Sequence, residues 1–184
     1  MTVRVRDAGP SEGGAIEAVT VSAYQQYAAV VPALWERYRE NIVATLAAAP
    51  PGSRIVAEAD GRIVGAVLLY PAGTVLDAPG AGSTALTEPM VRLLAVAPSA
   101  RGAGIGALLM DECARRAKAA GAPALALHTT DMMQAAMRLY GRLGFERAPA
   151  LDFEPAPGVV AKGFRLDLGA GISPRRAGDS DRRR

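Results

Sequence analysis

Cysteine and histidine are almost absent from the sequence, which holds one of each, Cys113 and His128. A single cysteine cannot form a disulfide within the chain, so a reducing, cytoplasmic setting is the default expectation. One histidine and no cluster of cysteines argue against a zinc site, and we expect no metal. Cys113 falls on the apolar stripe of an expected helix and is interpreted as a small core residue.

Long hydrophobic runs are also missing. The longest, such as residues 63–70, fall far short of the roughly 20 apolar residues that a membrane-spanning helix needs. Residues 1–7 alternate apolar and charged side chains, as a strand does, and do not resemble a signal peptide. We therefore expect no membrane association.

An excess of one charge is lacking from most of the chain. The formal net charge is +3, but residues 169–184 hold five arginines and two aspartates, which account for the whole of that excess. The remainder is close to neutral and shows no basic face that would favour nucleic acid. Half of the residues are hydrophobic, enough for a folded core. The sequence predicts one domain over residues 1–168 and a disordered arginine-rich tail over residues 169–184.

Apolar periodicity predicts an alternation of strands and helices. Strands are expected at residues 3–7, 54–60, 62–70, 88–97, 124–128, 145–153 and 159–168, and helices at residues 10–27, 33–48, 104–120 and 130–144. The dipeptide Asp60-Gly61 predicts a hairpin, and Thr130-Asp131 predicts a helix cap. Residues 71–87 have no period and are expected to form a long loop.

The stretch from residue 93 to residue 110, LLAVAPSARGAGIGALLM, is the most informative part of the sequence. It joins an apolar strand to a helix through a turn that contains Gly102, Gly104 and Gly106. The first N–H groups of a helix have no partner within it, and the helix dipole adds positive potential there. Glycines let the backbone approach a ligand closely and adopt positive φ. The turn therefore predicts a site for a phosphate or pyrophosphate group.

A Walker A loop, a dinucleotide-binding turn and a turn with no ligand are the first three candidates for this pattern. A Walker A loop requires Lys-Ser/Thr after the last glycine, where this chain has Ala107-Leu108, so it is set aside. Gly102, Gly104 and Ala107 fit the dinucleotide fingerprint G-x-G-x-x-G/A. That fingerprint also expects an acidic residue about 20 positions on, at the end of a second strand, and the strand here ends without one. A tight turn with no ligand is the structural alternative.

A further pattern fits at every defined position. Residues 101–106 match Q/R-x-x-G-x-G/A, the acetyl-CoA loop of the GNAT N-acetyltransferases. Residues 137–145, MRLYGRLGF, are similar to that family's A-x-x-L-Y-x-x-L-G-F segment. The chain resembles this family over nearly all of residues 1–168. The resemblance implies an α/β (α+β) fold whose mixed, mostly antiparallel sheet has about seven strands, a V-shaped splay between strands 4 and 5, and about four flanking helices.

The resemblance also implies a site for acetyl-CoA as the acyl-donor cosubstrate. Its pyrophosphate would bind the backbone amides of the glycine turn, and its pantetheine arm would pair with the preceding strand. A backbone amide of that strand would polarise the thioester carbonyl. The expected cofactor-binding residues are Leu94, Ala95, Val96, Arg101, Gly102, Ala103, Gly104, Ile105, Gly106 and Ala107.

Two side chains are predicted to be catalytic. Tyr140 occupies the family's tyrosine position, where its hydroxyl would protonate the departing sulfur. Glu88 is the candidate base that takes a proton from the amine, directly or through water. Many relatives have that acid where this chain has Met90, and they often have an asparagine where this chain has Met133. His128 and the aromatic residues of the first two helices are interpreted as structural.

The sequence thus predicts an N-acetyltransferase that moves the acetyl group of acetyl-CoA to a primary amine of a small molecule or peptide. A non-catalytic CoA-binding or sensing module of the same fold is the alternative, because the acid and the asparagine named above are replaced by methionine. A nicotinamide-dependent oxidoreductase is the third hypothesis. Relatives are often dimers, so the resemblance also suggests a homodimer.

Overall fold

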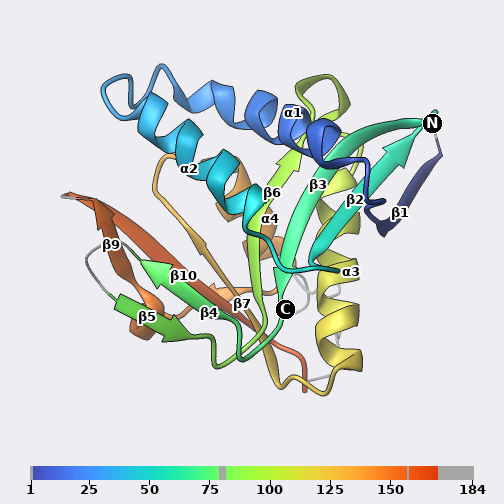
Figure 1. Ribbon diagram of the computed structural model, residues 1–184. Helices are drawn as coiled ribbons and strands as arrows, with labels where there is room; N and C mark the ends of the chain where they lie inside the picture. Colours follow the sequence, from blue (N-terminus) through green and yellow to red (C-terminus); the bar gives the residue numbers. More distant parts are fainter. Residues whose placement is uncertain (1, 79–81, 157, 170–184) are drawn as a thin grey trace, which may run out of the picture.

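The computed structural model describes residues 2–78, 82–156 and 158–169, and its elements form one large sheet with helices on both faces (Figure 1). The strands of this sheet are β1 (Val3–Asp7), β2 (Arg54–Ala59), β3 (Arg62–Tyr70), β6 (Met90–Val96), β7 (Ala124–Thr129), β8 (Glu146–Arg147), β9 (Phe153–Ala156) and β10 (Val159–Asp167). The helices are α1 (Gly13–Tyr24), α2 (Trp35–Ala47), α3 (Ile105–Ala119) and α4 (Gln134–Arg142). The predicted fold class is confirmed. Apart from Gly169, the predicted tail lies outside the described residues.

The strand order is β1-β2-β3-β6-β7-β10-β8, with β9 also paired to β10. All of these pairs are antiparallel except the one between β6 and β7. The Asp60-Gly61 turn that joins β2 to β3 has φ of 49° and 72°, as the predicted hairpin requires. None of the described helices is long and apolar enough to cross a membrane.

The central feature is the separation of β6 from β7. The two parallel strands pair only at Met90 with Ala126 and at Val91 with Leu127. Beyond that point β6 stays with β3 and β7 stays with β10, so the strands diverge. Leu93 and Leu94 both lie opposite the single residue Val67, and Leu93 has φ of 51°. This β-bulge bends β6 at the start of the divergence, which is the splay that the resemblance predicts.

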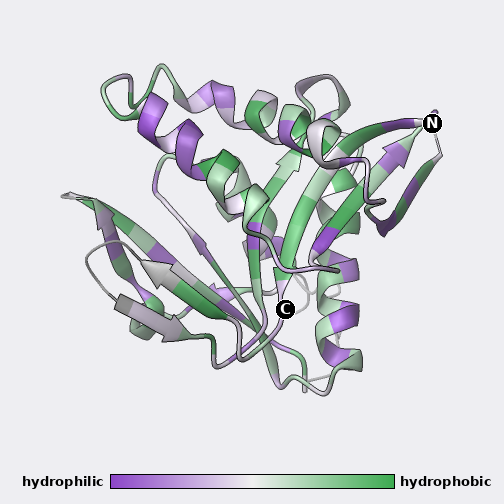
Figure 2. Cartoon of the chain, in the orientation of Figure 1, coloured by the Kyte–Doolittle hydropathy of each residue, from purple (hydrophilic) through white to green (hydrophobic). Residues whose placement is uncertain are grey.

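Two apolar cores hold the sheet, one on each face. On one face α3 and α4 pack on residues such as Val67, Val91 and Leu127. On the other face α1 and α2 pack on Leu68, Tyr70 and Ala95, among others. Figure 2 shows the apolar colouring that runs along the central strands, with polar bands on the outer sides of α2 and α3. Cys113 is fully buried in the first core, as predicted, and burial raises the pKa of its thiol to about 12.

The loop predicted over residues 71–87 is wrong, because a second, two-stranded sheet forms there. It consists of β4 (Val75–Ala78) and β5 (Gly82–Ala85), whose register includes Val75 opposite Ala85. Backbone hydrogen bonds hold such a hairpin together. Val75 and Thr84 are exposed, so the segment lacks the alternation of apolar and polar residues that marks a strand packed on a core.

Two other predicted elements also differ. The strand expected over residues 145–153 is interrupted after β8 by a 3-10 turn at Pro149–Leu151, since proline has no N–H to give to a ladder. The helix expected from Thr130-Asp131 begins later, at Gln134, and its N-cap residue makes no side-chain cap bond. Asp131 pairs instead with Lys162 of β10 at 2.5 Å.

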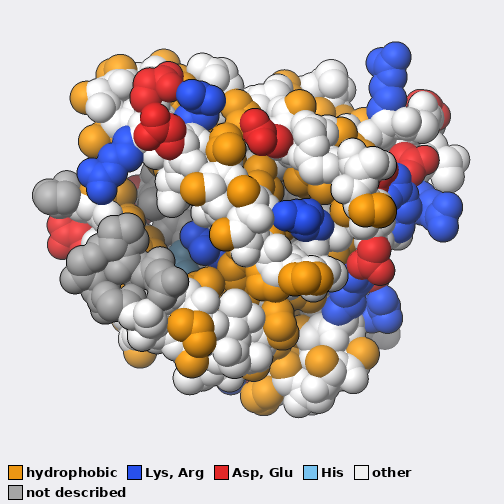
Figure 3. All heavy atoms as spheres, in the orientation of Figure 1, with side chains coloured by type: hydrophobic (Ala, Val, Ile, Leu, Met, Phe, Trp, Pro, Cys, Tyr) orange, Lys and Arg blue, Asp and Glu red, His pale blue; other side chains and the backbone are white. Residues whose placement is uncertain are grey.

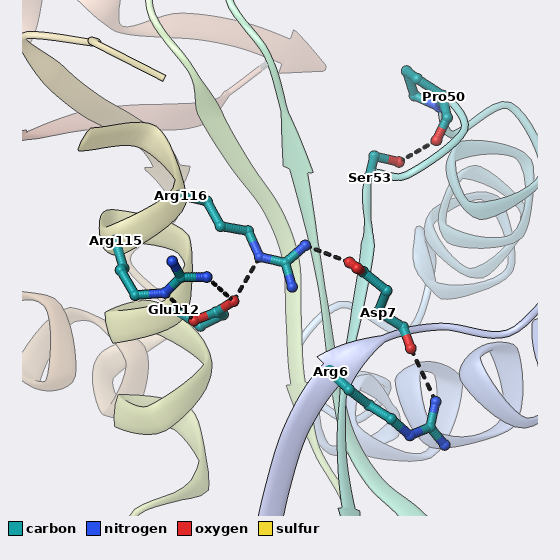
Figure 4. A network of polar contacts seen from close by, with 7 residues as sticks. All are labelled: Arg6, Asp7, Pro50, Ser53, Glu112, Arg115 and Arg116. Atoms are coloured by element: carbon teal, nitrogen blue, oxygen red, sulfur yellow. Dashed lines mark hydrogen bonds and ion pairs between the residues drawn. The ribbon is translucent and has the colours of Figure 1, made fainter. Parts of the chain in front are cut away.

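Charged side chains tie α3 to the edge strand of the sheet (Figure 4). Glu112 accepts hydrogen bonds from Arg115 at 2.7 Å and from Arg116 at 2.7 Å, and Arg116 also pairs with Asp7 at the end of β1. The bond from Arg115, together with Arg116, lowers the pKa of Glu112 to about 2. The helix whose first turn carries the glycine motif is therefore fixed at a second point along its length.

Candidate functional site

The turn between β6 and α3 has the conformation that the glycines predict. Gly102 has φ of 81° and Gly104, the N-cap residue of α3, has φ of 76°. The first bond of the helix runs from the Leu108 N–H to the Gly104 carbonyl at 3.1 Å. Within the described residues, the N–H groups of residues 101–107 make no hydrogen bond. Residues 101–104 are exposed. The turn therefore presents a run of open donors at the positive end of a helix.

At position 106 it is the lack of space, and not the backbone conformation, that requires glycine. Gly106 lies in the first turn of α3, and a Cβ there would come within 3.1 Å of Leu139 Cδ2 and 3.8 Å of Val96 Cγ2. Leu139 precedes Tyr140 on α4, so the absence of a side chain at Gly106 lets α4 approach the glycine turn. This packing brings the two motifs of the sequence, residues 101–106 and 137–145, into contact.

The second half of β6 has one unpaired edge. Ala95 and Val96 pair with Ala66 and Gly65 of β3, and no residue of β7 pairs with β6 beyond Val91. The backbone groups of Leu94 and Val96 that point toward β7 thus have no strand partner among the described residues, whereas Ala95 is only 2% exposed. The predicted cofactor-binding residues run from this edge to the first turn of α3, and Ile105 among them is buried, with 1% of its surface exposed.

Tyr140 lies on α4 with its ring against Phe145, the ring centroids being 5.8 Å apart. The side chain is 6% exposed, and its hydroxyl makes no hydrogen bond to the described residues. Burial raises the pKa of Tyr140 well above its usual value, and the nearby Tyr27 adds to this effect. The hydroxyl is therefore protonated near neutral pH and able to donate.

Glu88 is not on β6, which begins two residues later at Met90, so the predicted strand is too long at this end. Its carboxylate is held by Arg165 of β10. The Arg165 Nε–H donates to both oxygens at 2.9 and 3.0 Å, and Nη2 donates to Oε1 at 2.8 Å. The predicted base thus lies at the paired end of β6 and β7, in a bidentate ion pair.

His128 has a structural contact, as predicted. Its Nε2 lies 2.7 Å from the Leu151 carbonyl oxygen, and its ring meets Phe153 edge-on at 4.9 Å. Burial lowers the pKa of His128, which favours the neutral ring. Because a carbonyl can only accept, Nε2 carries the proton and donates to it.

Arg92, near the middle of β6, is a residue of the splay that the sequence interpretation missed. It is partly buried, and its guanidinium lies 5.7 Å from the centroid of the Tyr70 ring. Figure 3 shows a hollow below α2, with blue (Lys or Arg) and pale-blue (His) side chains on its inner wall. The signal in the sequence is a basic residue on the same strand as Met90 and two positions after it. From the sequence alone, such a residue is interpreted as an exposed charge on the surface.

The described residues contain no group of three or more histidine, cysteine, aspartate or glutamate side chains that could hold a metal ion. The donors that the splay and turn present are backbone amides, which suit a phosphate rather than a cation. The residues present therefore fit a diphosphate-bearing cosubstrate with an extended arm.

Comparisons with known proteins agree with this geometry. Residues 17–145 match the family described as the acetyltransferase (GNAT) family, and the chain belongs to this family. It is 30% identical over 120 residues to an uncharacterised N-acetyltransferase of Schizosaccharomyces pombe, covering 65% of this chain and 66% of that protein.

Solved structures show the same fold. A GNAT-family acetyltransferase from Staphylococcus aureus Mu50 has a TM-score of 0.66 and 15% identity over 91% of this chain and 99% of its own. The PaiA N-acetyltransferase of Thermoplasma acidophilum, in complex with coenzyme A, has a TM-score of 0.65 and 14% identity over 91% of this chain and 99% of its own.

We predict that Gly104→Ala weakens the binding of coenzyme A at least tenfold. A Cβ at this position has open space within the protein, but it would project toward a bound ligand and would strain the left-handed backbone by about 1–2 kcal/mol. Gly121→Ala is the matched control, because Gly121 has φ of 77°, equally open surroundings and a place at the opposite end of α3. Calorimetry should show weak binding for the first variant only. Equal affinities would remove the turn from the site.

Proposed function

We propose that this protein transfers the acetyl group of acetyl-CoA to a primary amine of a small molecule or peptide. The observation that carries the proposal is the run of open N–H donors at residues 101–107, continuous with the unpaired edge of β6 at residues 94–96. A diphosphate fits the first part and an extended amide-bearing arm fits the second. Membership of the GNAT family and the coenzyme A complex of a structural neighbour support the same assignment.

The chemistry sets two requirements on the chain. Near pH 7 an amine with a pKa of about 10.4 reaches its free-base form at a cost of about 4–5 kcal/mol, so a proton acceptor accelerates the reaction. The nitrogen then forms a bond to the thioester carbon, the carbon–sulfur bond breaks, and the sulfur leaves as a thiolate that takes up a proton. We assign the donated proton to Tyr140 and the accepted proton to Glu88, directly or through water.

Backbone donors supply the remaining part of the mechanism. Negative charge develops on the thioester oxygen as the amine attacks. The N–H groups along the open edge of β6, next to the Leu93 bulge, are fixed by the pairing with β3, so they need little reorganisation to stabilise that charge.

A non-catalytic coenzyme A module of the same fold is the competing function, because methionine stands at Met90 and Met133. The test is thiol release from acetyl-CoA in the presence of polyamines, aminoglycosides, amino acids and peptides with free N-termini. We expect turnover with at least one of these amines and detection of the N-acetyl product by mass spectrometry. Tight binding of acetyl-CoA without turnover on any amine would favour the non-catalytic module.

The role of Tyr140 predicts a selective loss of rate. Tyr140→Phe keeps the ring packed on Phe145 but removes the proton donor, and general-acid assistance is worth about 10²–10⁴-fold. We expect kcat to fall by about two orders of magnitude, with the affinity for coenzyme A unchanged by calorimetry. An unchanged kcat would exclude Tyr140 from the mechanism.

The role of Glu88 can be separated from its ion pair. If Glu88 accepts the proton, Glu88→Gln lowers kcat by about tenfold or more, with a larger deficit at low pH than at high pH, where the amine is already unprotonated. Arg165→Gln removes the partner and leaves the carboxylate, so this control should retain most of the rate. Equal losses in the two variants would mean that Glu88 only anchors β10.

A further inference from the structure

Arg92 differs from the other partly buried arginines of the described residues, which are Arg6, Arg39, Arg54, Arg116 and Arg165. Arg6, Arg39, Arg116 and Arg165 pair with carboxylates, and Arg54 donates to the Leu46 carbonyl at 2.7 Å. Among the described residues, Arg92 has neither a carboxylate within 4.0 Å nor a carbonyl acceptor. Its contacts are with Tyr70, whose hydroxyl forms a hydrogen bond with it and whose ring centroid lies 5.7 Å from the guanidinium. The phenol of Tyr70 is neutral and does not compensate the charge of a partly buried guanidinium. The anion that would complete this site is therefore not among the described residues.

The position of Arg92 identifies which side of the splay it faces. Its partner across the strand pair is Leu68, which packs in the core under α1 and α2, and partners in register lie on the same face of a sheet. His128 lies on that face of β7, because Ala126, two residues earlier, pairs with Met90. Arg92 and His128 thus lie on the same face of the sheet, one on β6 and the other on β7, the two strands that diverge.

The surroundings confirm that the guanidinium lies among the side chains of this face. Burial raises the pKa of Tyr24, Tyr38 and Tyr70 and lowers that of His128, and in all four the Arg92 charge acts to lower the pKa. The wall around Arg92 is therefore aromatic and holds few competing charges. In such surroundings a guanidinium attracts an anion more strongly than it does in open water.

The diphosphate of coenzyme A is not the anion that Arg92 would meet. The donors for that group begin at Arg101, five residues past the end of β6, whereas Arg92 is two residues before Leu94. At about 3.3 Å per residue, Arg92 lies about 7 Å along the strand from the segment assigned to the thioester and about 13 Å before the end of the strand. The distance matches an anionic group carried a few bonds from the attacking amine.

We propose that Arg92 binds a carboxylate of the acceptor, so that the acceptor is an amino acid or another amine with a carboxylate close to its nitrogen. The planar guanidinium can hold both carboxylate oxygens and so orient the amine toward β6. This proposal rests on the proposed function, since it names the class of acceptor for the same site.

The test compares each of glycine, leucine, phenylalanine, lysine and glutamate with its own C-terminal amide as acceptor. The proteins are the wild type, Arg92→Gln, Arg92→Lys and, as a charge-matched control, Arg4→Gln on the exposed edge strand β1. We expect the wild type to favour at least one acid over its amide by tenfold or more in kcat/KM. Amidation makes the amine less basic, so intrinsic reactivity opposes this preference.

Arg92→Gln should abolish the preference by raising KM for the acid at least tenfold while changing kcat/KM for the amide less than twofold. Arg92→Lys should keep part of the preference, and Arg4→Gln all of it. Equal use of acid and amide by the wild type would overturn the proposal. Equal losses on both acceptors in Arg92→Gln would also overturn it, since they would show a purely structural role.

A second measurement does not depend on turnover. We expect the N-acetyl derivative of the preferred amino acid, but not its amide, to bind the protein in the presence of coenzyme A by calorimetry, and Arg92→Gln to abolish that binding. Carboxylate-dependent binding without turnover on any amine would uphold the Arg92 site and defeat the proposed function. Turnover of amines without a preference for a carboxylate would uphold the proposed function and defeat the Arg92 site. An absence of carboxylate-dependent binding for all five derivatives would overturn the Arg92 site.

Discussion

The structure depends on a strand edge that is left open inside a sheet. β6 and β7 share two paired positions and then diverge, with β3 and β10 holding the outer edge of each. Unpaired N–H and C=O groups are costly when they are shielded from water. A fold that keeps such an edge needs either solvent or a ligand that repeats the hydrogen bonds of a strand. The pantetheine arm, which carries amides at intervals along an extended chain, is of this kind.

Tight packing keeps the splay in place. Gly65 on β3 lies beneath α3, where a Cβ would come within 3.0 Å of Ile105 and 3.1 Å of both Leu109 and the Ala95 carbonyl oxygen. The first turn of α3 is thereby packed closely onto β3 and β6. The opposite core fixes α1 and α2 over the same strands. The two strands of the splay are thus held by different partners, β6 by β3 and β7 by β10.

The elements that could be predicted from the sequence are those determined by residues close together in the chain. The glycine turn, the hairpin at Asp60-Gly61 and the amphipathic face of α3 each follow from neighbouring residues, and the structure has all three. The β4–β5 hairpin was missed because its pairing leaves no apolar alternation, and the strand after Phe145 was overextended across Pro149. Glu88 pairs with Arg165, 77 positions away, and Arg92 has no carboxylate near it among the described residues. Both features come from tertiary contacts that no local pattern encodes.

The distribution of charge follows from the same geometry. The folded part of the chain is near neutral overall, so attraction for anions comes from local arrangement and not from net charge. The turn offers backbone N–H dipoles, which can surround a diphosphate. Unlike lysine and arginine side chains, these groups are short and fixed in position. Arg92 offers a full charge on a planar group, which suits a carboxylate that must be held in one orientation. Arg92 lies in the first half of β6, and the glycine turn follows the end of that strand. An acceptor held by Arg92 and a donor held by the glycine turn would therefore meet between these two points, near the bulge at Leu93.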